Sequence, residues 1–321
     1  RYTDNGILRN LSYDAVIVGS SMTENFRTSL LDGLFFCQSV KVPSAGASWY
    51  EASELVNTAL RYQPELRLVI RGLDMDHHMD EAPEALDYGL GIFPTYLYND
   101  DPVDDLYYIL NRDVLYGSAQ AVLAALRGAE PGITSMDDYG AWGSEYRYGK
   151  TNALCREAPY ADAPQQPLTR ERIDRVLYNA REKLLRPALE HPQTQFYYFL
   201  TPYSAAWWGD LRQNGQLEAQ LEMEALVLSQ LVSCENIHIF SWNAQEELVL
   251  DLANYKDRIH YGPWVNDWIL EEMAAESGRL TQENLEDYLS RERSLYEDFD
   301  FNTLFRQTDP EEGYIPEFFR K

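Results

Sequence analysis

Two short stretches carry side chains that could do chemistry together. Near the start, an apolar run ends at Gly19, and Ser20 and Ser21 follow it. Near the end, Asp257 and His260 stand three residues apart. A serine that attacks a carbonyl needs a base, and the base needs an acid that orients it. On a turn, Asp257 can hold one ring nitrogen of His260, which leaves the other nitrogen for a serine hydroxyl.

Each stretch also has a plainer interpretation. Serines often cap helices, so Ser20 and Ser21 could serve only the helix expected after them. The pattern Asp-x-x-His occurs again at Asp74 and His77, and a surface loop can carry both residues by chance. The run from Asp74 to Asp80 holds carboxylates and imidazoles that can ligate zinc or manganese. Nothing in its spacing fixes a coordination geometry, and we expect neither a metal site nor a cofactor.

Composition limits the possible partners. The formal net charge of −25 argues against nucleic acid and against anionic membrane surfaces, because phosphates would be repelled. The apolar fraction of 45% suffices for a sizeable core. No apolar run approaches the length of a membrane span. The chain begins at Arg1 without a methionine, so we expect an upstream signal peptide or anchor helix. The three cysteines are expected to be free thiols.

Short apolar runs that alternate with helical patterns predict the fold class. An α/β protein is expected, with a five-stranded parallel sheet of order 2-1-3-4-5 covered by helices on both faces. That order places Ser21 at a switch point, where such sheets bind ligands. The expected strands are residues 14–19, 39–43, 66–70, 195–201 and 236–240. Residues 1–321 are expected to form one domain, with an insertion or lid at 75–165 and an acidic extension at 281–321.

The order of these features resembles the SGNH (GDSL-like) hydrolases over residues 12–74 and 195–275. That resemblance implies a flavodoxin-like, three-layer α/β/α fold. It implies that Ser21 is the nucleophile, that Asp257 and His260 are the orienting acid and the base, and that the N–H groups of Ser21 and Gly46 help to hold the oxyanion. The form Gly19-Ser20-Ser21 resembles an extracytoplasmic branch that includes proteins of teichoic-acid D-alanylation and polysaccharide O-acetylation.

One position departs from the family pattern. The family's third block is Gly-x-Asn-Asp, and its Asn donates to the oxyanion, whereas this chain has Gly72-Leu73-Asp74. An ionised carboxylate would repel the oxyanion, and the loss of one such donor typically costs about 2.7–4 kcal/mol in the barrier. Three outcomes are open: Asp74 is held protonated, another N–H substitutes for it, or activity is low.

Aromatic residues follow several expected strand ends, on the side of the proposed site. Aromatic faces stack well on sugar rings, although core packing is the alternative. The candidate substrate-binding residues are Trp49, Arg71, Tyr203, Trp207 and Trp264.

The expected function combines these observations with the family resemblance. It is that of a serine esterase or acyltransferase that forms an acyl-enzyme and acts on O-acyl, chiefly O-acetyl, groups of a cell-envelope or extracellular glycan. A catalytically weak, SGNH-like module that binds a glycan or an envelope partner is the alternative. Metal-assisted hydrolysis by the Asp74–Asp80 run is a third option. The resemblance further implies a bacterial, extracytoplasmic protein, anchored to the membrane through a removed N-terminal segment.

Overall fold

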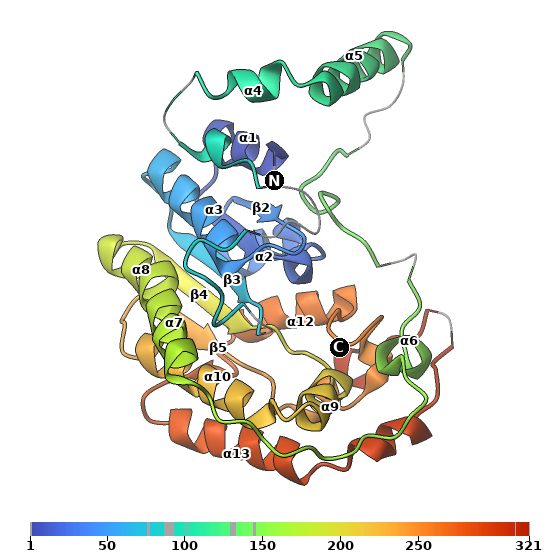
Figure 1. The fold of residues 1–321 in the computed structure, drawn as a ribbon. Helices are drawn as coiled ribbons and strands as arrows, with labels where there is room; N and C mark the ends of the chain where they lie inside the picture. The colour runs from blue at the N-terminus through green and yellow to red at the C-terminus, as the bar shows by residue number, and fades with distance from the viewer. Residues whose placement is uncertain are drawn as a thin grey trace.

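The central element is a six-stranded sheet with helices packed on both faces (Figure 1). The computed structural model describes residues 2–75, 78–86, 93–99, 101, 103–128, 133–143, 146–311 and 313–320. The strand order is β2-β1-β3-β4-β5-β6. The strands are β1 (Ala15–Gly19), β2 (Ser39–Pro43), β3 (Leu68–Leu73), β4 (Gln195–Leu200), β5 (Ile237–Phe240) and β6 (Arg279–Leu280).

The first three strands lie side by side, with β2 at the edge of the sheet and β1 between β2 and β3. Every residue of β1, β2 and β3 is buried, which suits strands that are covered on both faces. In the parallel register, Gly19 lies beside Pro43 and Val18 lies beside Arg71. The carboxyl ends of the three strands therefore meet at one edge of the sheet. The loops that follow them carry Ser21, Gly46 and Asp74 to that edge.

The coarse prediction of an α/β fold is confirmed, whereas the prediction of five strands, all parallel, is wrong. A sixth strand, β6, pairs antiparallel with β5, so that Ile239 lies beside Leu280 and Phe240 beside Arg279. Gly278, at φ +74°, lies directly before this strand. A strand of two residues has no hydrophobic period to detect, which explains why the sequence did not indicate it.

The main helices fall into two sets. Helices α2 and α12 contact each other, whereas α1, α3, α7 and α10 form a second series that is linked by contacts through residues 181–185. The helices of these sets and their extensions are α1 (Tyr2–Asn10), α2 (Thr28–Phe35), α3 (Trp49–Tyr62), α7 (Arg170–Ala180), the π-helical η3 (Arg181–Leu185), α8 (Arg186–Glu190), α9 (Ala205–Gln213), α10 (Leu217–Leu231) and α12 (Pro263–Ala274).

The predicted insertion and extension contain further helices. The insertion holds η2 (Thr95–Tyr98), α4 (Leu106–Ile109), α5 (Arg112–Leu126) and α6 (Lys150–Leu154), and the extension holds α13 (Leu285–Asp298), η5 (Phe301–Arg306) and η6 (Glu317–Phe319). Shorter helices between these parts are η1 (Ser21–Thr23), α11 (Glu246–Val249) and η4 (Leu252–Asn254). In Figure 1, α4 and α5 lie end to end above α1, at one end of the molecule. No helix in the described ranges has the length and apolar character needed to cross a bilayer.

Helix α13 is attached to α10 by two buried carboxyl groups, Glu224 and Glu292. Asn243 donates to Glu224, and the Tyr288 hydroxyl donates to Glu292. Burial raises the pKa of Glu292 to about 7 and raises that of Glu224 well above its usual value. Two buried carboxylates in contact repel each other, so the pair holds at least one proton near neutral pH.

Candidate active site

The turn after β1 leaves one serine hydroxyl available. The Ser20 side chain accepts from Met22 N at 3.2 Å, and the hydroxyl of Thr23 donates to Ser20 O at 2.9 Å. Gly19 is required here, because a Cβ on it would lie 2.5 Å from Thr23 Cγ2. Ser20 is therefore the capping serine, and the hydroxyl of Ser21 is left to face another part of the chain.

The acid and the base share one short loop. Asp257 Oδ1 accepts from the backbone N–H groups of Ile259, at 3.0 Å, and of His260, at 2.8 Å. An antiparallel bridge between Tyr255 and Tyr261 closes the loop on both sides. The carboxylate of Asp257 is thus fixed by the backbone of the same turn that carries His260.

The structure brings Ser21, His260 and Asp257 into one hydrogen-bonded chain. Ser21 Oγ lies 2.7 Å from His260 Nε2, and His260 Nδ1 lies 2.8 Å from Asp257 Oδ2. The His260 side chain is 19% exposed, so the site can be reached from solvent. Burial raises the pKa of Asp257, but the hydrogen bonds from His260 and Ile259 and the charge of the imidazole outweigh it, and that pKa lies below its usual value. An ionised Asp257 can stabilise an imidazolium.

One backbone carbonyl joins the turn that carries Ser21 to the loop that carries Asp257 and His260. Met22 O, in the nucleophile turn, accepts from the amide of Asn266 at 2.9 Å and from the hydroxyl of Tyr261 at 3.3 Å. Tyr261 follows His260 directly, and Asn266 lies in α12. The turn of Ser21 and the loop of His260 therefore cannot move far apart without breaking buried hydrogen bonds.

Backbone N–H groups near Ser21 could hold an oxyanion. Ser44 N donates to Gly19 O at 2.8 Å, which places the loop after β2 against the nucleophile turn. Gly46 lies within that loop at φ +65°, where a side chain would be strained. In the described part of the chain, no group accepts from the N–H of Ser21 or from that of Gly46. Both donors are therefore available.

Asp74 has a protein partner. Its side chain is buried, and the hydroxyl of Tyr203 donates to its Oδ1 at 3.0 Å. Its backbone carbonyl accepts from the indole N–H of Trp49 at 3.1 Å. Asp74 thus acts as an acceptor toward Tyr203, which an ionised carboxylate can do and which gives no support to a donor role at an oxyanion.

Most of the predicted substrate-binding residues lie in the core. Trp49 is 2% exposed and Arg71 is fully buried, with its guanidinium donating to the Ser53 hydroxyl and to the carbonyls of Trp49 and Lys183. These contacts contradict a substrate role for Trp49 and Arg71, because a substrate cannot reach them. Burial lowers the pKa of Arg71 to about 10.

The remaining three aromatic candidates differ in position. Tyr203 is 1% exposed and Trp207 is 8% exposed, and their rings pack edge to face at 4.9 Å. This is core packing, which sequence patterns could not separate from a binding wall. Trp264 is only partly buried and packs against Tyr148. Of the predicted binding residues, Trp264 lines the larger of the two clefts described below.

A tryptophan that the sequence did not indicate contacts the base. The ring of Trp142, from the predicted insertion, lies edge-on to that of His260 at 5.7 Å. Its indole N–H donates to Glu24 at 2.6 Å, and its backbone N–H is accepted by the Asn25 side chain at 2.8 Å. Burial raises the pKa of Glu24. The surrounding sequence has no helical or strand period, so only the presence of a tryptophan in a polar insertion could have indicated it.

A buried lysine fastens the segment that carries Trp142. Lys41 Nζ, in β2, donates to the carbonyls of Glu24, Phe26 and Asp137, the last two at 3.0 Å. The Asp137 carboxylate in turn accepts from Ser29 N at 2.9 Å, at the start of α2. Burial lowers the pKa of Lys41 to about 8. We call residues 133–143 the strap, because this part of the insertion is bonded to the edge of the sheet that carries Ser21.

A cleft of about 910 Å³ begins beside the strap. Gly143 and Tyr146 line it, and Tyr146 packs edge to face against Trp142. Its further aromatic lining is Tyr148, Trp264 and Tyr314, and its charged lining is Arg147, Asp309 and Glu311. None of Ser21, Asp257 and His260 lines this cleft, but Tyr146, which does, packs against Trp142, whose ring lies against that of His260. We call it the strap cleft.

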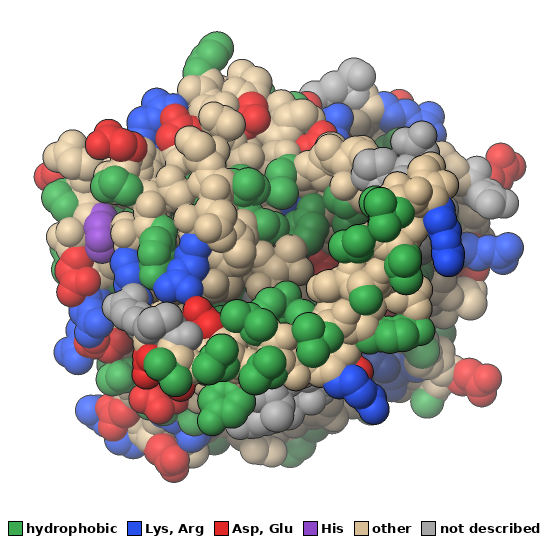
Figure 2. Space-filling view, turned by 90° about the horizontal axis from the view of Figure 1, so that it is seen from above, with side chains coloured by type: hydrophobic (Ala, Val, Ile, Leu, Met, Phe, Trp, Pro, Cys, Tyr) green, Lys and Arg blue, Asp and Glu red, His purple; other side chains and the backbone are tan. Residues whose placement is uncertain are grey.

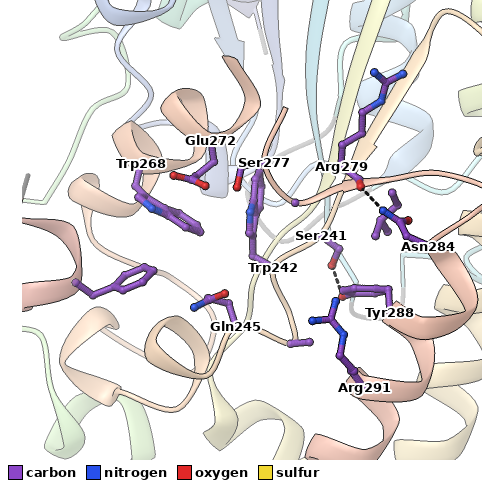
Figure 3. Close-up of a pocket in the computed structure, with 14 residues that line it drawn as sticks. Ser241, Trp242, Gln245, Trp268, Glu272, Ser277, Arg279, Asn284, Tyr288 and Arg291 are labelled. Carbon is purple, nitrogen blue, oxygen red and sulfur yellow. Dashed lines mark hydrogen bonds between the residues drawn. The ribbon is translucent and has the colours of Figure 1, made fainter. Parts of the chain in front are cut away.

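A second cleft, of about 600 Å³, lies beside β5 and β6 and includes none of the three triad residues (Figure 3). Trp242 and Trp268 form one wall, while the guanidinium of Arg291 points into the cleft from α13. At its base, the hydroxyls of Ser241 and Tyr288 lie 2.6 Å apart. It thus combines aromatic and polar groups away from Ser21. We call it the edge cleft.

The described residues contain no group of three or more His, Cys, Asp or Glu side chains that could hold a metal ion. Asp76 and His77, part of the run considered above as a metal site, lie outside the described residues. His78 Nδ1 lies 3.1 Å from Glu81, and Asp80 pairs with Arg172. These described members of the run therefore have protein partners.

Comparisons with known proteins give little further guidance. No family model matches the chain, and no curated protein matches it. A solved structure from Streptococcus pneumonia, described provisionally as a platelet activating factor, is similar at 10% sequence identity and a TM-score of 0.42, over 90% of each chain. Similarity at this level establishes neither a shared fold nor a shared function.

Proposed function

We propose that this protein is an SGNH-type serine hydrolase or acyltransferase that acts on O-acyl groups of a glycan. The observation that carries the proposal is the chain of contacts from Ser21 Oγ to His260 Nε2, at 2.7 Å, and from His260 Nδ1 to Asp257 Oδ2, at 2.8 Å. Nucleophile, base and orienting acid are within hydrogen-bond reach of one another, as acyl transfer by serine requires.

The proposed reaction follows from these positions. Ser21 Oγ attacks the ester carbonyl carbon while His260 Nε2 takes the hydroxyl proton. The tetrahedral oxyanion is held by the N–H groups of Ser21 and Gly46, and Asp257 stabilises the imidazolium. When the intermediate collapses, His260 returns the proton to the leaving alcohol and an acyl-Ser21 ester remains. Water or a sugar hydroxyl then gives its proton to His260 and attacks the acyl carbon. When this second intermediate collapses, His260 returns the proton to Ser21 Oγ, which leaves as the free hydroxyl.

A glycan ester is the proposed substrate because of the strap cleft. Tyr146 and Tyr314, 44% and 38% exposed, present aromatic surface there, and Trp264 adds a partly buried ring. Aromatic rings stack on the apolar faces of sugars, and the charged groups of the cleft can bond to hydroxyls. An extracytoplasmic, membrane-anchored location remains part of the proposal and rests on the sequence resemblance.

The test is hydrolysis of p-nitrophenyl acetate by wild type, Ser21→Ala, His260→Ala and the matched control Ser20→Ala. We expect the first two variants to fall to background and Ser20→Ala to stay within about tenfold of wild type, because Ser20 only caps the turn. A fluorophosphonate label located by mass spectrometry should modify Ser21. Wild type that neither turns over nor takes the label would contradict the proposal.

The edge cleft favours a second candidate, a glycan-binding module of low activity. It offers Trp242, Trp268 and Arg291 away from the triad, and the acceptor role of Asp74 fits weak oxyanion stabilisation. Glycan binding by wild type and Ser21→Ala alike, lost in Arg291→Ala and without any turnover, would support this function over the first.

A further inference from the structure

The segment 103–128, which we call the arm, exposes an unusual amount of apolar surface. Among the described residues, twenty large apolar side chains are exposed, and ten of them lie between Val103 and Leu126. Helix α5 has fifteen residues and buries none of them. An isolated helix of this length is marginal in water, so α5 lacks the packing that normally holds such a helix. The arm therefore needs a partner.

The apolar residues of α5 share one face. Leu115, Ala119, Val122 and Leu126 follow the spacing i, i+4, i+7 and i+11, which places them on a single stripe of a helix. Tyr116 and Leu123 flank that stripe, whereas Asp113 and Gln120 lie opposite. Leu126 is 79% exposed and Tyr116 is 67% exposed. The face that would normally point into a core thus points into solvent.

The apolar surface is a broad ridge rather than a single stripe. It continues from α5 onto α4, where Tyr107 is 72% exposed, and onto α1, where Tyr2 is 44% exposed and stacks on Tyr108 at 5.6 Å. Seen from above, the side of the molecule where the arm lies, hydrophobic side chains gather in a band across the surface (Figure 2). A fluid bilayer can accommodate a ridge of this kind without a matching shape, whereas a protein groove is suited to one helical stripe.

Charge and size narrow the choice of partner. Between residues 106 and 126 the only charged residues are Arg112 and Asp113, so this part is neutral in a chain of net charge −25. A second copy of the arm is too small a partner, because ten exposed large apolar residues on each side fall short of the 20–30 residues a side of a stable interface. Helix α5 is also shorter than the ~20 residues that a membrane span needs.

We propose that the arm docks the protein onto a zwitterionic bilayer, with α5 lying in the headgroup region parallel to the membrane plane. The aliphatic stripe enters the acyl boundary, and Tyr107 and Tyr116 lie at the interface, where tyrosine is favoured. The acidic remainder of the chain is repelled by anionic lipids, so docking is strongest on membranes that carry no net charge. This inference does not depend on the activity of Ser21.

The test is flotation of the whole chain with phosphatidylcholine vesicles. The disrupting variant is Leu115→Asp with Val122→Asp, on the stripe, and the matched control is Gln120→Asp with Ala121→Asp, which adds the same charge to exposed positions away from it. We expect wild type and the control to float with vesicles within twofold of each other and the stripe variant at least tenfold less. Thermal unfolding should be unchanged in both variants, because α5 buries no residue.

Hydrogen exchange provides a second measurement that does not depend on any variant. Amides of residues 112–126 should exchange more slowly when phosphatidylcholine vesicles are added. Wild type that stays unbound, vesicle binding by the stripe variant equal to wild type, or binding confined to anionic vesicles would overturn the proposal. A concentration-dependent dimer that the stripe variant abolishes, without vesicle binding, would assign the arm to a second copy instead.

Discussion

The nucleophile turn, Ser21–Thr23, and the arm, residues 103–128, are both short helical segments, but the first is held by buried contacts and the second is exposed. The turn at Ser21 is one 3-10 turn, yet Met22 O accepts from two side chains and Thr23 packs against two strand glycines, Gly19 and Gly72. Helix α5 is five times as long and buries no residue. Length therefore does not decide which segment is held firmly in this molecule.

What differs is how the two segments are attached. The nucleophile turn is attached by buried side chains that donate to its backbone carbonyls, and each such bond is costly to leave unmade. The arm contacts the other described residues through a few side chains, among them Tyr2 stacked on Tyr108, Tyr96 against Tyr107, and Asn99 bonded to Asp104. Catalytic geometry needs the first kind of attachment, because small displacements cost large factors in rate. A docking surface can function with the second.

The largest expected effect comes from Asp257→Asn. The amide keeps the shape of the carboxylate but cannot stabilise the imidazolium, so kcat for ester hydrolysis should fall about 10⁴-fold with little change in Tm. Steady-state kinetics against wild type would measure this. A fall of less than tenfold would mean that Asp257 serves the loop and not the base.

The same change, Gly→Ala, can be made in both regions. In the turn, Gly19→Ala puts a Cβ 2.5 Å from Thr23, so we expect about 1–3 kcal/mol of lost stability and at least a hundredfold loss of Ser21 labelling. Urea unfolding and the rate of fluorophosphonate labelling would measure the two effects. Unchanged labelling would show that the turn tolerates more movement than its contacts indicate.

The strap is tested by Trp142→Ala and Trp142→Phe. Loss of the ring frees one side of His260, and we expect kcat to fall about 10- to 100-fold in the alanine variant. Phenylalanine keeps the ring contact but loses the bond to Glu24, so its kcat should lie between those of wild type and Trp142→Ala. Equal activity of wild type and both variants would show that the contact between Trp142 and His260 does not contribute to the proposed activity.

The attachment of α13 to α10 can be tested through the pH dependence of the buried pair Glu224 and Glu292. The folded pKa of Glu292 is about 7, above the ordinary 4.5, so the stabilisation it provides is complete below pH 4.5 and is lost as the pH rises through 7. Glu292→Gln cannot ionise, and its free energy of unfolding should fall less between pH 5 and pH 8 than that of wild type. Urea unfolding at the two pH values checks this. Parallel losses in both proteins would place the titration elsewhere.

The smallest expected effect is that of Gly117→Ala in α5. A Cβ there meets nothing within 4 Å, and alanine favours a helix by about 1 kcal/mol over glycine. Local hydrogen exchange in α5 should slow while the global Tm stays the same. A rise in global stability would mean that the arm is coupled to the core after all, which would weaken the comparison with the nucleophile turn.

The parts of the molecule that could be predicted from sequence are those with a strong local pattern. Apolar runs such as that of β1 indicated the coarse α/β fold, and Asp257 and His260 stood out by type and spacing. The choice of Ser21 over Ser20 came from the family resemblance. The two-residue β6 carries no period. Arg71 was misassigned because a charged residue at a strand end is typical of a site, whereas here its Nη1 and Nη2 atoms donate to acceptors in the core.

Long-range contacts were the second obstacle. Trp142 lies against His260 in a segment that is held by its own bonds to Glu24 and Asn25 and by Lys41, and such contacts between distant parts of a chain cannot be inferred from one sequence. The exposure of α5 was likewise not evident, since an apolar stripe on a helix ordinarily predicts burial. Whether the insertion is a lid and whether 281–321 is a separate extension remain predictions.

The loop between Tyr255 and Tyr261 has a consequence for how the proposed site could change over time. Acid and base are encoded within four consecutive positions, and their mutual bond needs no other segment. The contact from His260 to Ser21 spans 239 positions of the chain, as does the bond from Tyr261 to Met22 O. The bond between Asp257 and His260 thus forms within one loop, and it can persist when Ser21 is replaced. A descendant that lacks the proposed acyl transfer could still keep an imidazole oriented by Asp257 for a different reaction.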